Sequence, residues 1–449
     1  MGRLFGTDGV RGVANSELTC ELALNLGRAA AFVLTKNSKT RPKIFIGKDT
    51  RTSSSMLESA IAAGMCSFGA QVVLLGYLPT PAVAYLVSQH DADCGVMISA
   101  SHNPCEYNGI KLFDKNGLKL PDCIEDEIEK VLNNGILDRD LPIGNDIGNI
   151  EHHYEYVEQY INHVVNTIDI RLDGLKLAID CANGCASYTA HEIFSRLGAK
   201  CCMLSDKPDG ANINNNCGST HTELLREFVL NNKVDLGLAF DGDSDRCLAL
   251  DENGELIDGD KIIAILSKQL KESGKLNKNT AVVTIMSNLG FKLFADENGI
   301  DCVTTAVGDR YVLEEMLKSD YSIGGEQSGH VIIKEFATTG DGQLVGVQLA
   351  SVLKNTGKSA SELACVMKVL PQVIVNVVVD KQFKDIYKTD SVIISEIQRV
   401  EKILSNDGRV LIRASGTEPL IRVMIEGNDT EQITKLANGI AEIIKERAI

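Results

Sequence analysis

Four short polar segments of this 449-residue chain carry the side chains that could do chemistry, and the first is SASHNP at 99–104. It directly follows the apolar run GVMIS. In open α/β sheets, ligands bind beyond the carboxyl ends of strands, so this loop would lie where a ligand binds. The Ser101 hydroxyl beside the His102 imidazole offers a nucleophile with a polar neighbour. The alternative is a Ser- and Asn-rich turn without chemistry.

The second segment is DGDSDR at 241–246, which follows the apolar run VDLGLAF. Asp241, Asp243 and Asp245 would repel one another strongly unless a divalent cation lay between them. The spacing partly matches a calcium EF-hand loop, with Glu252 at its twelfth position. However, Arg246 occupies the sixth position, where the EF-hand turn needs Gly, and the preceding segment is a predicted strand. The pattern favours Mg²⁺ acting with a substrate phosphate.

The third and fourth segments are GGEQSGH at 324–330 and RASGTEP at 413–419, the latter closed by Arg422. Glu and His side chains can hold sugar hydroxyls and move protons near neutral pH. A guanidinium, two hydroxyls and a glycine-containing turn can together hold a phosphate. Either segment could instead be a plain turn. No Walker loop precedes Ser359, because Val352 stands where its first Gly belongs, and no G-x-G-x-x-G follows a strand, so ATP and NAD are poor candidates.

Short β-branched runs alternate with segments of helical period through most of the chain, which predicts βαβ units. We expect an α/β protein of three βα-type domains, with mixed sheets and helices on both faces, plus a smaller C-terminal α+β domain, around a central cleft. A polar, turn-rich linker is predicted at 136–152. One motif falls in each expected domain, and the four domains are expected at 1–150, 151–254, 255–370 and 371–449.

Charge and composition limit the classes of function. The 45 Lys and Arg residues against 61 Asp and Glu residues give a formal charge of −16, which argues against nucleic-acid binding but does not exclude a small anion. The 13 cysteines are scattered without a C-x-x-C pair, which indicates a reducing compartment. No run of 18 apolar residues and no signal-peptide core occur. We therefore expect a cytoplasmic protein without a membrane partner.

The four motifs, in this order and with the opening LFGTDGVRG at 4–12, resemble the α-D-phosphohexomutase superfamily over essentially the whole chain. The opening, GEQSGH and RASGTEPLIRV resemble its bacterial members that act on glucosamine phosphates. This resemblance implies interconversion of glucosamine 6-phosphate and glucosamine 1-phosphate, on the route to UDP-N-acetylglucosamine and the cell wall. It implies a phosphoserine enzyme, one Mg²⁺ per active site, a bound glucosamine 1,6-bisphosphate intermediate and a homodimer.

The resemblance also implies roles for residues around the nucleophile. Ser101 would be the phosphorylated serine, its loop shaped by His102 and Asn103, with Arg11 steadying the phosphoserine. The Mg²⁺ ligands would be a phosphoserine oxygen of Ser101 and the carboxylates of Asp241, Asp243 and Asp245, with Arg246 beside them.

The remaining implied roles concern the sugar and the second phosphate. Lys111 and His330 match proton-transfer groups, and Glu326 and Ser328 would contact sugar hydroxyls. The phosphate that does not transfer would be held by a clamp formed by Arg413, Ser415, Gly416, Thr417 and Arg422. Gly416 stands where some relatives carry Asn.

Two alternatives stay open. The same machinery could act on mannose or glucose phosphates, which relative turnover of the three 6-phosphates would distinguish. A calcium- or sugar-phosphate-binding protein without turnover would also explain the acidic loop and the clamp, but it gives no reason for Ser101.

Overall fold

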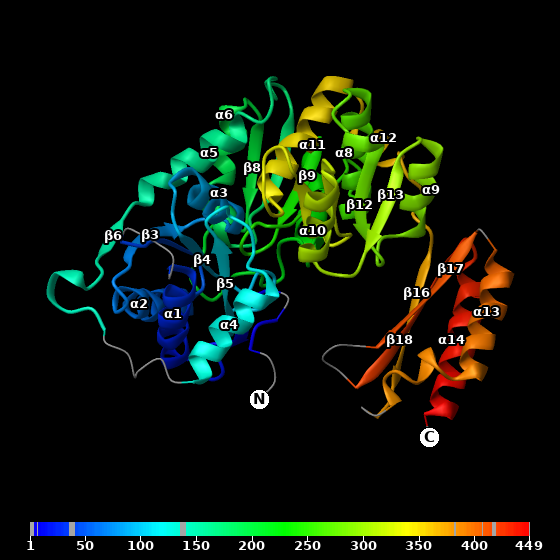
Figure 1. Ribbon diagram of the computed structural model, residues 1–449. Helices are drawn as coiled ribbons and strands as arrows, with labels where there is room; N and C mark the ends of the chain where they lie inside the picture. The colour runs from blue at the N-terminus through cyan, green and yellow to red at the C-terminus, as the bar shows by residue number, and fades with distance from the viewer. Residues whose placement is uncertain are drawn as a thin grey trace. The chain divides into compact units, whose positions relative to one another are not determined.

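The computed structural model describes residues 4–6, 8–35, 41–134, 141–380, 383–405, 407–414 and 419–448, and these residues form four β-sheets (Figure 1). The chain divides into two compact units. The first comprises Met1–Met286 with Gly299–Val366 and holds three of the sheets. The second comprises Ser287–Asn298 with Met367–Ile449 and holds the fourth.

The first sheet has six strands in the order β1-β5-β4-β2-β3-β6. Strands β4, β2, β3 and β6 run parallel to one another, β5 is antiparallel to β4, and β1 is antiparallel to β5. Its elements in chain order are β1 (Val10–Val13), α1 (Cys20–Thr35), β2 (Lys43–Lys48), α2 (Thr52–Cys66), β3 (Gln71–Tyr77), α3 (Thr80–Gln89), β4 (Cys94–Ile98), β5 (Tyr107–Asp114), α4 (Asp122–Asn133) and β6 (Ile150–His152).

Strand β2 shows why helices cover both faces of this sheet. Successive side chains of a strand point to opposite faces. Ile44 and Ile46 join the apolar cluster formed with α1, α2 and α4. A Cβ on Gly47 would meet the Val83 side chain of α3 at 2.6 Å, so this position faces the other side. The sheet therefore lies between α3 and the other three helices, as the apolar run of β2 predicts.

The second sheet has the order β11-β10-β9-β7-β8, with β8, β7 and β9 parallel and the two hairpin strands antiparallel. Helix α7 packs on one face, where Leu225 and Val229 contact Ala178 and Ala239. Helices α6 and α11 lie on the other, near Leu238. The elements are α5 (Val157–Val165), β7 (Lys176–Asp180), α6 (Ala190–Arg196), β8 (Lys200–Leu204), α7 (Glu223–Asn232), β9 (Leu236–Phe240), β10 (Cys247–Leu250) and β11 (Leu256–Ile257).

The third sheet has the order β13-β12-β14-β15, of which only β15 is antiparallel to its neighbour. Neighbouring glycines of β14 face opposite helices: Gly324 lies against Met316 of α10, and Gly325 against Ile263 of α8. The elements are α8 (Gly259–Glu272), β12 (Thr280–Thr284), β13 (Asp301–Thr305), α10 (Asp309–Ser319), β14 (Ile323–Gly325), β15 (Val331–Ile333), α11 (Gly342–Thr356) and α12 (Ala360–Ala364).

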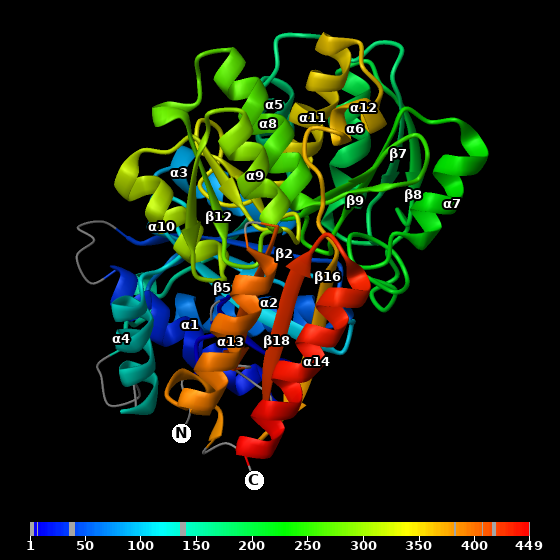
Figure 2. The same cartoon turned by 90° about the vertical axis from the view of Figure 1, so that its right-hand side faces the viewer.

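The second unit is an antiparallel three-stranded sheet, β16-β18-β17, with α13 and α14 on one face (Figures 1 and 2). The buried Glu426 carboxylate accepts bonds from Arg409 Nε at 2.6 Å and from the Leu289 N–H at 3.0 Å, so it ties the start of α9 to this unit. The elements are α9 (Leu289–Glu297), β16 (Gln372–Val378), α13 (Ser391–Leu404), β17 (Gly408–Ala414), β18 (Leu420–Gly427) and α14 (Thr430–Arg447).

The predicted α/β class is confirmed, with three mixed sheets covered on both faces and a smaller α+β part. The predicted linker at 136–152 is wrong at its end. Ile150–His152 forms β6, which pairs with β3 and adds an edge strand to the first sheet, and Gly144–Asp146 is a short 3₁₀ turn. An edge strand is paired on one side only, and its residues remain largely exposed. The run therefore contains too few apolar residues to indicate a strand.

Candidate active site

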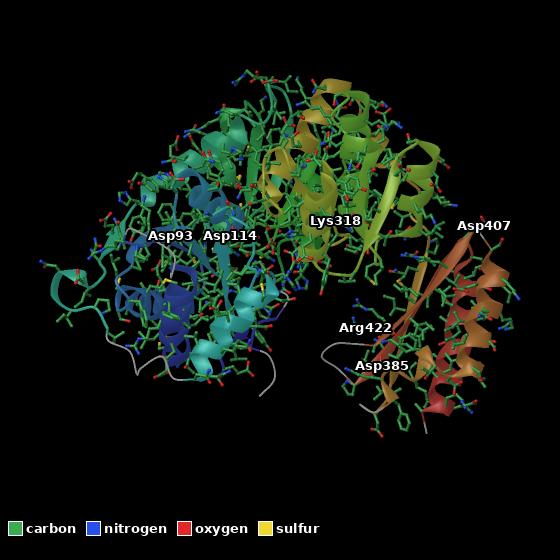
Figure 3. All side chains as sticks on the ribbon, in the orientation of Figure 1. Asp93, Asp114, Lys318, Asp385, Asp407 and Arg422 are labelled. Carbon is green, nitrogen blue, oxygen red and sulfur yellow. The ribbon has the colours of Figure 1, made fainter. Side chains whose placement is uncertain are left out.

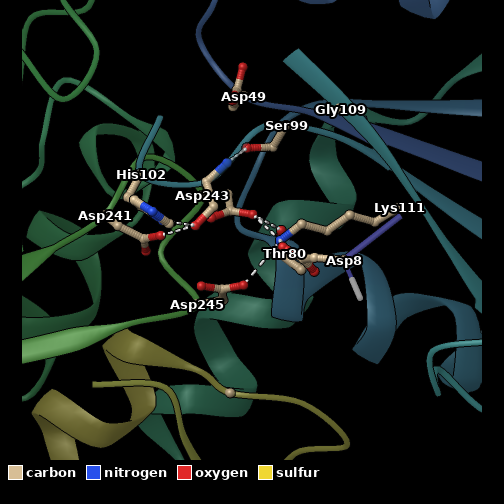
Figure 4. Close-up of polar contacts among 12 residues, drawn as sticks. Asp8, Asp49, Thr80, Ser99, His102, Gly109, Lys111, Asp241, Asp243 and Asp245 are labelled. Atoms are coloured by element: carbon tan, nitrogen blue, oxygen red, sulfur yellow. Dashed lines mark hydrogen bonds and ion pairs between the residues drawn. The ribbon is translucent and has the colours of Figure 1, made fainter. Parts of the chain in front are cut away.

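The predicted nucleophile and the predicted metal loop meet in the first unit. The Ser101 hydroxyl, in the loop after β4, donates a hydrogen bond to Asp241 Oδ2 at 2.5 Å, in the loop after β9. Asp241, Asp243 and Asp245 are buried and each places one carboxylate oxygen within 4.8 Å of those of the other two (Figure 4). Residues 140 positions apart in sequence are therefore joined beyond the carboxyl ends of β4 and β9, which belong to two different sheets.

Both loops turn sharply through a residue in the left-handed backbone region. Ser101 has φ of 53° and Ser244 has φ of 59°, a conformation that costs an L-residue about 1–2 kcal/mol. The Ser244 N–H donates to the Asp241 carbonyl, and the Arg246 N–H donates to Asp241 Oδ1 at 3.2 Å. This tight turn brings the alternate carboxylates of the loop to one side.

The three carboxylates fit a hard divalent cation. The Oδ1 atoms of Asp243 and Asp245 are buried and have no hydrogen-bond partner. Such atoms are costly unless a cation satisfies them, and oxygen-only ligands suit Mg²⁺. Burial, followed by Asp245 and Asp243, raises the pKa of Asp241 well above its usual range. The cluster is thus short of positive charge.

Lys111 supplies part of that charge. Strand β5 places its Nζ 2.7 Å from Asp243 Oδ2 and 3.1 Å from Asp245 Oδ2, with only 1% of the side chain exposed (Figure 4). Burial opposes the charge, but Asp243, Asp245 and Asp8 together raise the pKa of Lys111 well above its usual value. Lys111 is therefore a cation that β5 places among the carboxylates of the metal loop.

Thr80 is a site residue that the sequence did not indicate. At the start of α3, its hydroxyl donates to Asp243 Oδ2 at 2.5 Å and its N–H donates to the Asp243 carbonyl at 3.0 Å. Together with Lys111, it occupies one oxygen of Asp243, whereas the other oxygen is buried without a hydrogen-bond partner.

The surroundings of Ser101 suit an anion. His102 Nδ1 lies 3.4 Å from the Ser101 hydroxyl. Burial, followed by Arg246 and Arg11, lowers the pKa of His102 to about 4, so this ring is neutral at pH 7. The Nε atoms of both arginines are buried without a hydrogen-bond partner. Two cations close enough to act on the neighbouring His102 would favour a phosphate on Ser101.

The remaining loop residue, Asn103, contributes through its main chain. Its carbonyl accepts hydrogen bonds from Arg51 at 2.8 Å and Asn214 at 3.0 Å, and its N–H donates to the Ala100 carbonyl. These main-chain contacts tie Asn103 into the loop, and its role toward the phosphoserine stays a prediction.

His330, between β14 and β15, reaches the same cluster. Its ring is buried, its Nδ1 lies 3.8 Å from Asp245 Oδ1, and its Nε2 accepts the Gly340 N–H at 3.0 Å. Although burial opposes protonation, Asp245 and Asp309 raise the pKa of His330 above its usual value. Asp309 also pairs with Lys119, which in turn lies 2.6 Å from Asp8, so a chain of charges surrounds the site.

The predicted sugar-binding segment forms the turn between β14 and β15. Glu326 is half-buried, and its Oε1 accepts the Gly308 N–H at 3.1 Å, whereas Ser328 is exposed. Gly329 has φ of 94°, and a Cβ there would lie 2.5 Å from the Cys247 carbonyl oxygen, so this position requires glycine.

The second unit contains the described part of the predicted phosphate clamp. Arg413 on β17 lies directly opposite Arg422 on β18, whose side chain is labelled in Figure 3. Like charges at directly opposed strand positions destabilise a sheet, and a bound anion would offset this cost. Ser415, Gly416 and Thr417 lie outside the described residues.

Comparison with known proteins identifies the family. Four sequence profiles match in order: phosphoglucomutase/phosphomannomutase alpha/beta/alpha domain I at residues 2–138, domain II at 155–254, domain III at 258–370 and the C-terminal domain at 374–443. The chain belongs to the phosphoglucomutase/phosphomannomutase family.

Two curated relatives of this chain share one name within this family. Curated proteins named phosphoglucosamine mutase from Clostridium novyi (strain NT) and Clostridium botulinum (strain Kyoto / Type A2) are each 54% identical over 448 residues, which covers 100% of both chains. In fold, the chain is similar to a phosphoglucomutase/phosphomannomutase family protein from Burkholderia thailandensis (TM-score 0.83, 21% identity, 100% and 98% of the two chains). It is also similar to Aspergillus fumigatus N-acetylphosphoglucosamine mutase (TM-score 0.71, 17% identity, 99% and 96%).

Two further observations concern the cysteines and the helices. The structure has all 13 cysteines as free thiols. Among the residues that it describes, no helix is both long and apolar enough to cross a membrane.

Proposed function

We propose that this chain is an isomerase that interconverts glucosamine 6-phosphate and glucosamine 1-phosphate through a phosphorylated Ser101 and a bound glucosamine 1,6-bisphosphate. The observation that carries the proposal is the buried Ser101 hydroxyl, 2.5 Å from a carboxylate of a three-aspartate cluster with two unpartnered oxygens. A binding protein without turnover would have no use for a nucleophile at this position.

The residues of this chain match the needs of phosphoryl transfer, which are in-line positioning and neutralisation of charge on the phosphoryl oxygens. Arg11 and Arg246 each have a buried Nε without a hydrogen-bond partner and act electrostatically on His102, and the neutral His102 ring would lie beside the phosphoserine without competing for its charge. The bond from phosphorus to Ser101 Oγ breaks as a bond to the sugar O1 forms. The sugar hydroxyl proton passes to a base, for which His330 is the candidate. Lys111 is the second proton-transfer candidate, but its raised pKa keeps it protonated, so it would donate a proton rather than accept one.

Asp241, Asp243 and Asp245, together with a phosphoserine oxygen, would hold Mg²⁺, which when bound would neutralise charge on the transferring phosphate. Glu326 and Ser328 would contact sugar hydroxyls. Arg413, Ser415, Gly416, Thr417 and Arg422 would hold the phosphate that does not transfer. The bisphosphate then returns its 6-phosphate to Ser101, so phosphate is conserved over the cycle.

The choice of sugar rests on the relatives. The curated Clostridium proteins are named phosphoglucosamine mutase, and the Aspergillus protein is described in complex with GlcNAc-6P and magnesium. Glucosamine phosphates are therefore the first substrates to test, and mannose and glucose phosphates are the alternatives.

The test is an isomerisation assay on glucosamine 6-phosphate with Mg²⁺ and a trace of 1,6-bisphosphate, using wild type, Ser101→Ala and, as a matched control, Ser88→Ala on the exposed side of α3. We expect Ser101→Ala to lose at least a thousandfold in activity and the control to lose none. Full activity of Ser101→Ala would refute the mechanism. Faster turnover of mannose or glucose 6-phosphate by wild type would refute the substrate assignment.

Three finer proposals accompany this function. Limited proteolysis tests domain boundaries near 150, 254 and 370. Light scattering tests the homodimer that the resemblance implies, and cell fractionation tests a cytoplasmic location, which the free thiols support.

A further inference from the structure

The backbone of the nucleophile is held in a strained conformation. Ser101 has φ of 53°, in the region that L-residues other than Asn and Asp rarely adopt, and only 1% of the residue is exposed. A strained residue at a functional site persists when its surroundings over-determine it. The contacts of the Ser101 main chain therefore identify what holds the nucleophile in place.

One of these contacts comes from Arg51, just after β2. Its Nη2 donates to the Ser101 carbonyl at 3.0 Å and to the Asn103 carbonyl at 2.8 Å, and its Nη1 donates to the Pro104 carbonyl at 2.6 Å. The side chain is wholly buried, and its charge is balanced by Asp49, whose Oδ2 accepts from Arg51 Nε at 2.9 Å. The planar guanidinium of Arg51 thus donates hydrogen bonds to three carbonyls of one loop.

A second contact comes from Asn214, between β8 and α7. Its Nδ2 donates to the Ser101 carbonyl at 2.8 Å and to the Asn103 carbonyl at 3.0 Å. Its own N–H is fixed by the Ala182 carbonyl at 2.9 Å. A Cβ on Gly242, in the aspartate loop, would lie 2.7 Å from the Ser101 carbonyl oxygen. Segments associated with two different sheets therefore converge on one carbonyl.

On the other side, the Ser101 N–H donates to Ser99 Oγ at 2.9 Å. With both its N–H and its carbonyl fixed, the residue keeps its left-handed backbone. In that backbone the hydroxyl points to Asp241, at 2.5 Å. Arg51 and Asn214 bind the Ser101 carbonyl rather than its hydroxyl, so their effect on the hydroxyl passes through the main chain.

We propose that Arg51 and Asn214 are positioning residues for phosphoryl transfer, which together hold the Ser101 carbonyl so that the hydroxyl, or its phosphate, is aimed at the aspartate cluster. The inference rests on the proposed function, because it concerns the same nucleophile. Small misplacements of a reacting group can lower a rate by about a hundredfold without weakening substrate binding. Loss of either residue should therefore reduce kcat more than it changes KM.

The test uses Asn214→Asp, which keeps the shape but replaces the donor with a carboxylate oxygen, and Arg51→Lys, which keeps the charge beside Asp49 but not the fork. The matched control is Asn216→Asp, at an exposed left-handed position of the same loop, with φ of 51°. Three quantities are measured on the full chain: kcat and KM for glucosamine 6-phosphate, the single-turnover rate of Ser101 phosphorylation by glucose 1,6-bisphosphate, and the melting temperature.

We expect Asn214→Asp and Arg51→Lys to lower kcat and the single-turnover rate by the same factor, about 10- to 100-fold, with KM within about threefold of wild type. The Asn216→Asp control should match wild type. If Arg51→Lys does not fold, Asn214→Asp carries the test, and Asn214→Ser, a smaller change, replaces it should that variant also fail to fold.

Folded variants with single-turnover rates within twofold of wild type would overturn the inference, as would a loss seen only in KM. The proposed function fails separately: there, wild type itself would not isomerise glucosamine 6-phosphate.

Discussion

Removing the Lys111 cation should make this protein less stable without Mg²⁺ and bind Mg²⁺ more tightly. In wild type, the Asp241, Asp243 and Asp245 carboxylates share the site with Lys111 and Arg246, and these five side chains, when all are ionised, carry one net negative charge. Replacing one partner of a buried ion pair costs about 3–5 kcal/mol, because the remaining charges lose their compensation. We expect Lys111→Met to lose an amount of this order in metal-free buffer.

The same variant leaves two net negative charges, which one divalent cation balances. It also frees Asp243 Oδ2 from the bond to Lys111 at 2.7 Å. We therefore expect the Mg²⁺ dissociation constant to fall at least tenfold, which corresponds to about 1.4 kcal/mol of additional stabilisation at saturating Mg²⁺. The rise in melting temperature on adding Mg²⁺ should be larger in the variant than in wild type.

The assay is thermal unfolding of the unphosphorylated protein over a series of Mg²⁺ concentrations, with calorimetric titration as a second measure of affinity. Lys115→Met, at an exposed position directly after the end of β5, is the control and should behave as wild type. An unchanged or weaker Mg²⁺ affinity in Lys111→Met would refute the placement of the cation among these carboxylates.

Further predictions address pH, thiols and the second unit. Burial raises the pKa of Asp341 to about 6, so the folded state binds its proton more tightly than the unfolded state, and stability falls as pH rises from about 4 to 6. Asp341→Asn should therefore melt above wild type at pH 7.5, by up to about 3 kcal/mol of stability, with the gap closing toward pH 4. Exposed Cys123 and Cys365 should react with iodoacetamide before Cys94 and Cys181, whose pKa values burial raises, as peptide mass spectrometry would show; equal labelling would contradict the packing. Glu426→Gln should destabilise the second unit by about 1–3 kcal/mol, because Arg409 loses its charged partner; unchanged hydrogen exchange in β16–β18 would contradict this.

Much of the fold could be predicted from the sequence because its strands are buried on both faces. The apolar run at 43–48 coincides with β2, since short apolar runs rich in β-branched and aromatic residues are typical of interior strands. Strand β6 was missed because it is paired only with β3 and has exposed residues at both ends. Periodicity thus identifies interior strands well and edge strands poorly.

Only part of the candidate site could be predicted from the sequence, for a similar reason. Residues in dense polar motifs, such as Ser101 and Asp243, were found because their own spacing suggests chemistry. Thr80 and Arg51 were missed because each stands in a segment of ordinary composition and acquires its role only by contact with another loop. Such contacts are set by tertiary packing, which local patterns do not encode.

The strand order of the first sheet supplies a signal that could have identified Thr80 and Arg51. Strands β4, β2 and β3 are adjacent and parallel, so their carboxyl ends meet at one edge of the sheet. Each is followed within three residues by a side chain that serves the site: Ser101 after β4, Arg51 after β2 and Thr80 after β3. Once three neighbouring parallel strands are predicted, the first polar residues after each become candidates together, even where only one stands in a motif. A loop of ordinary composition then becomes a candidate for the site because of the strand that it follows.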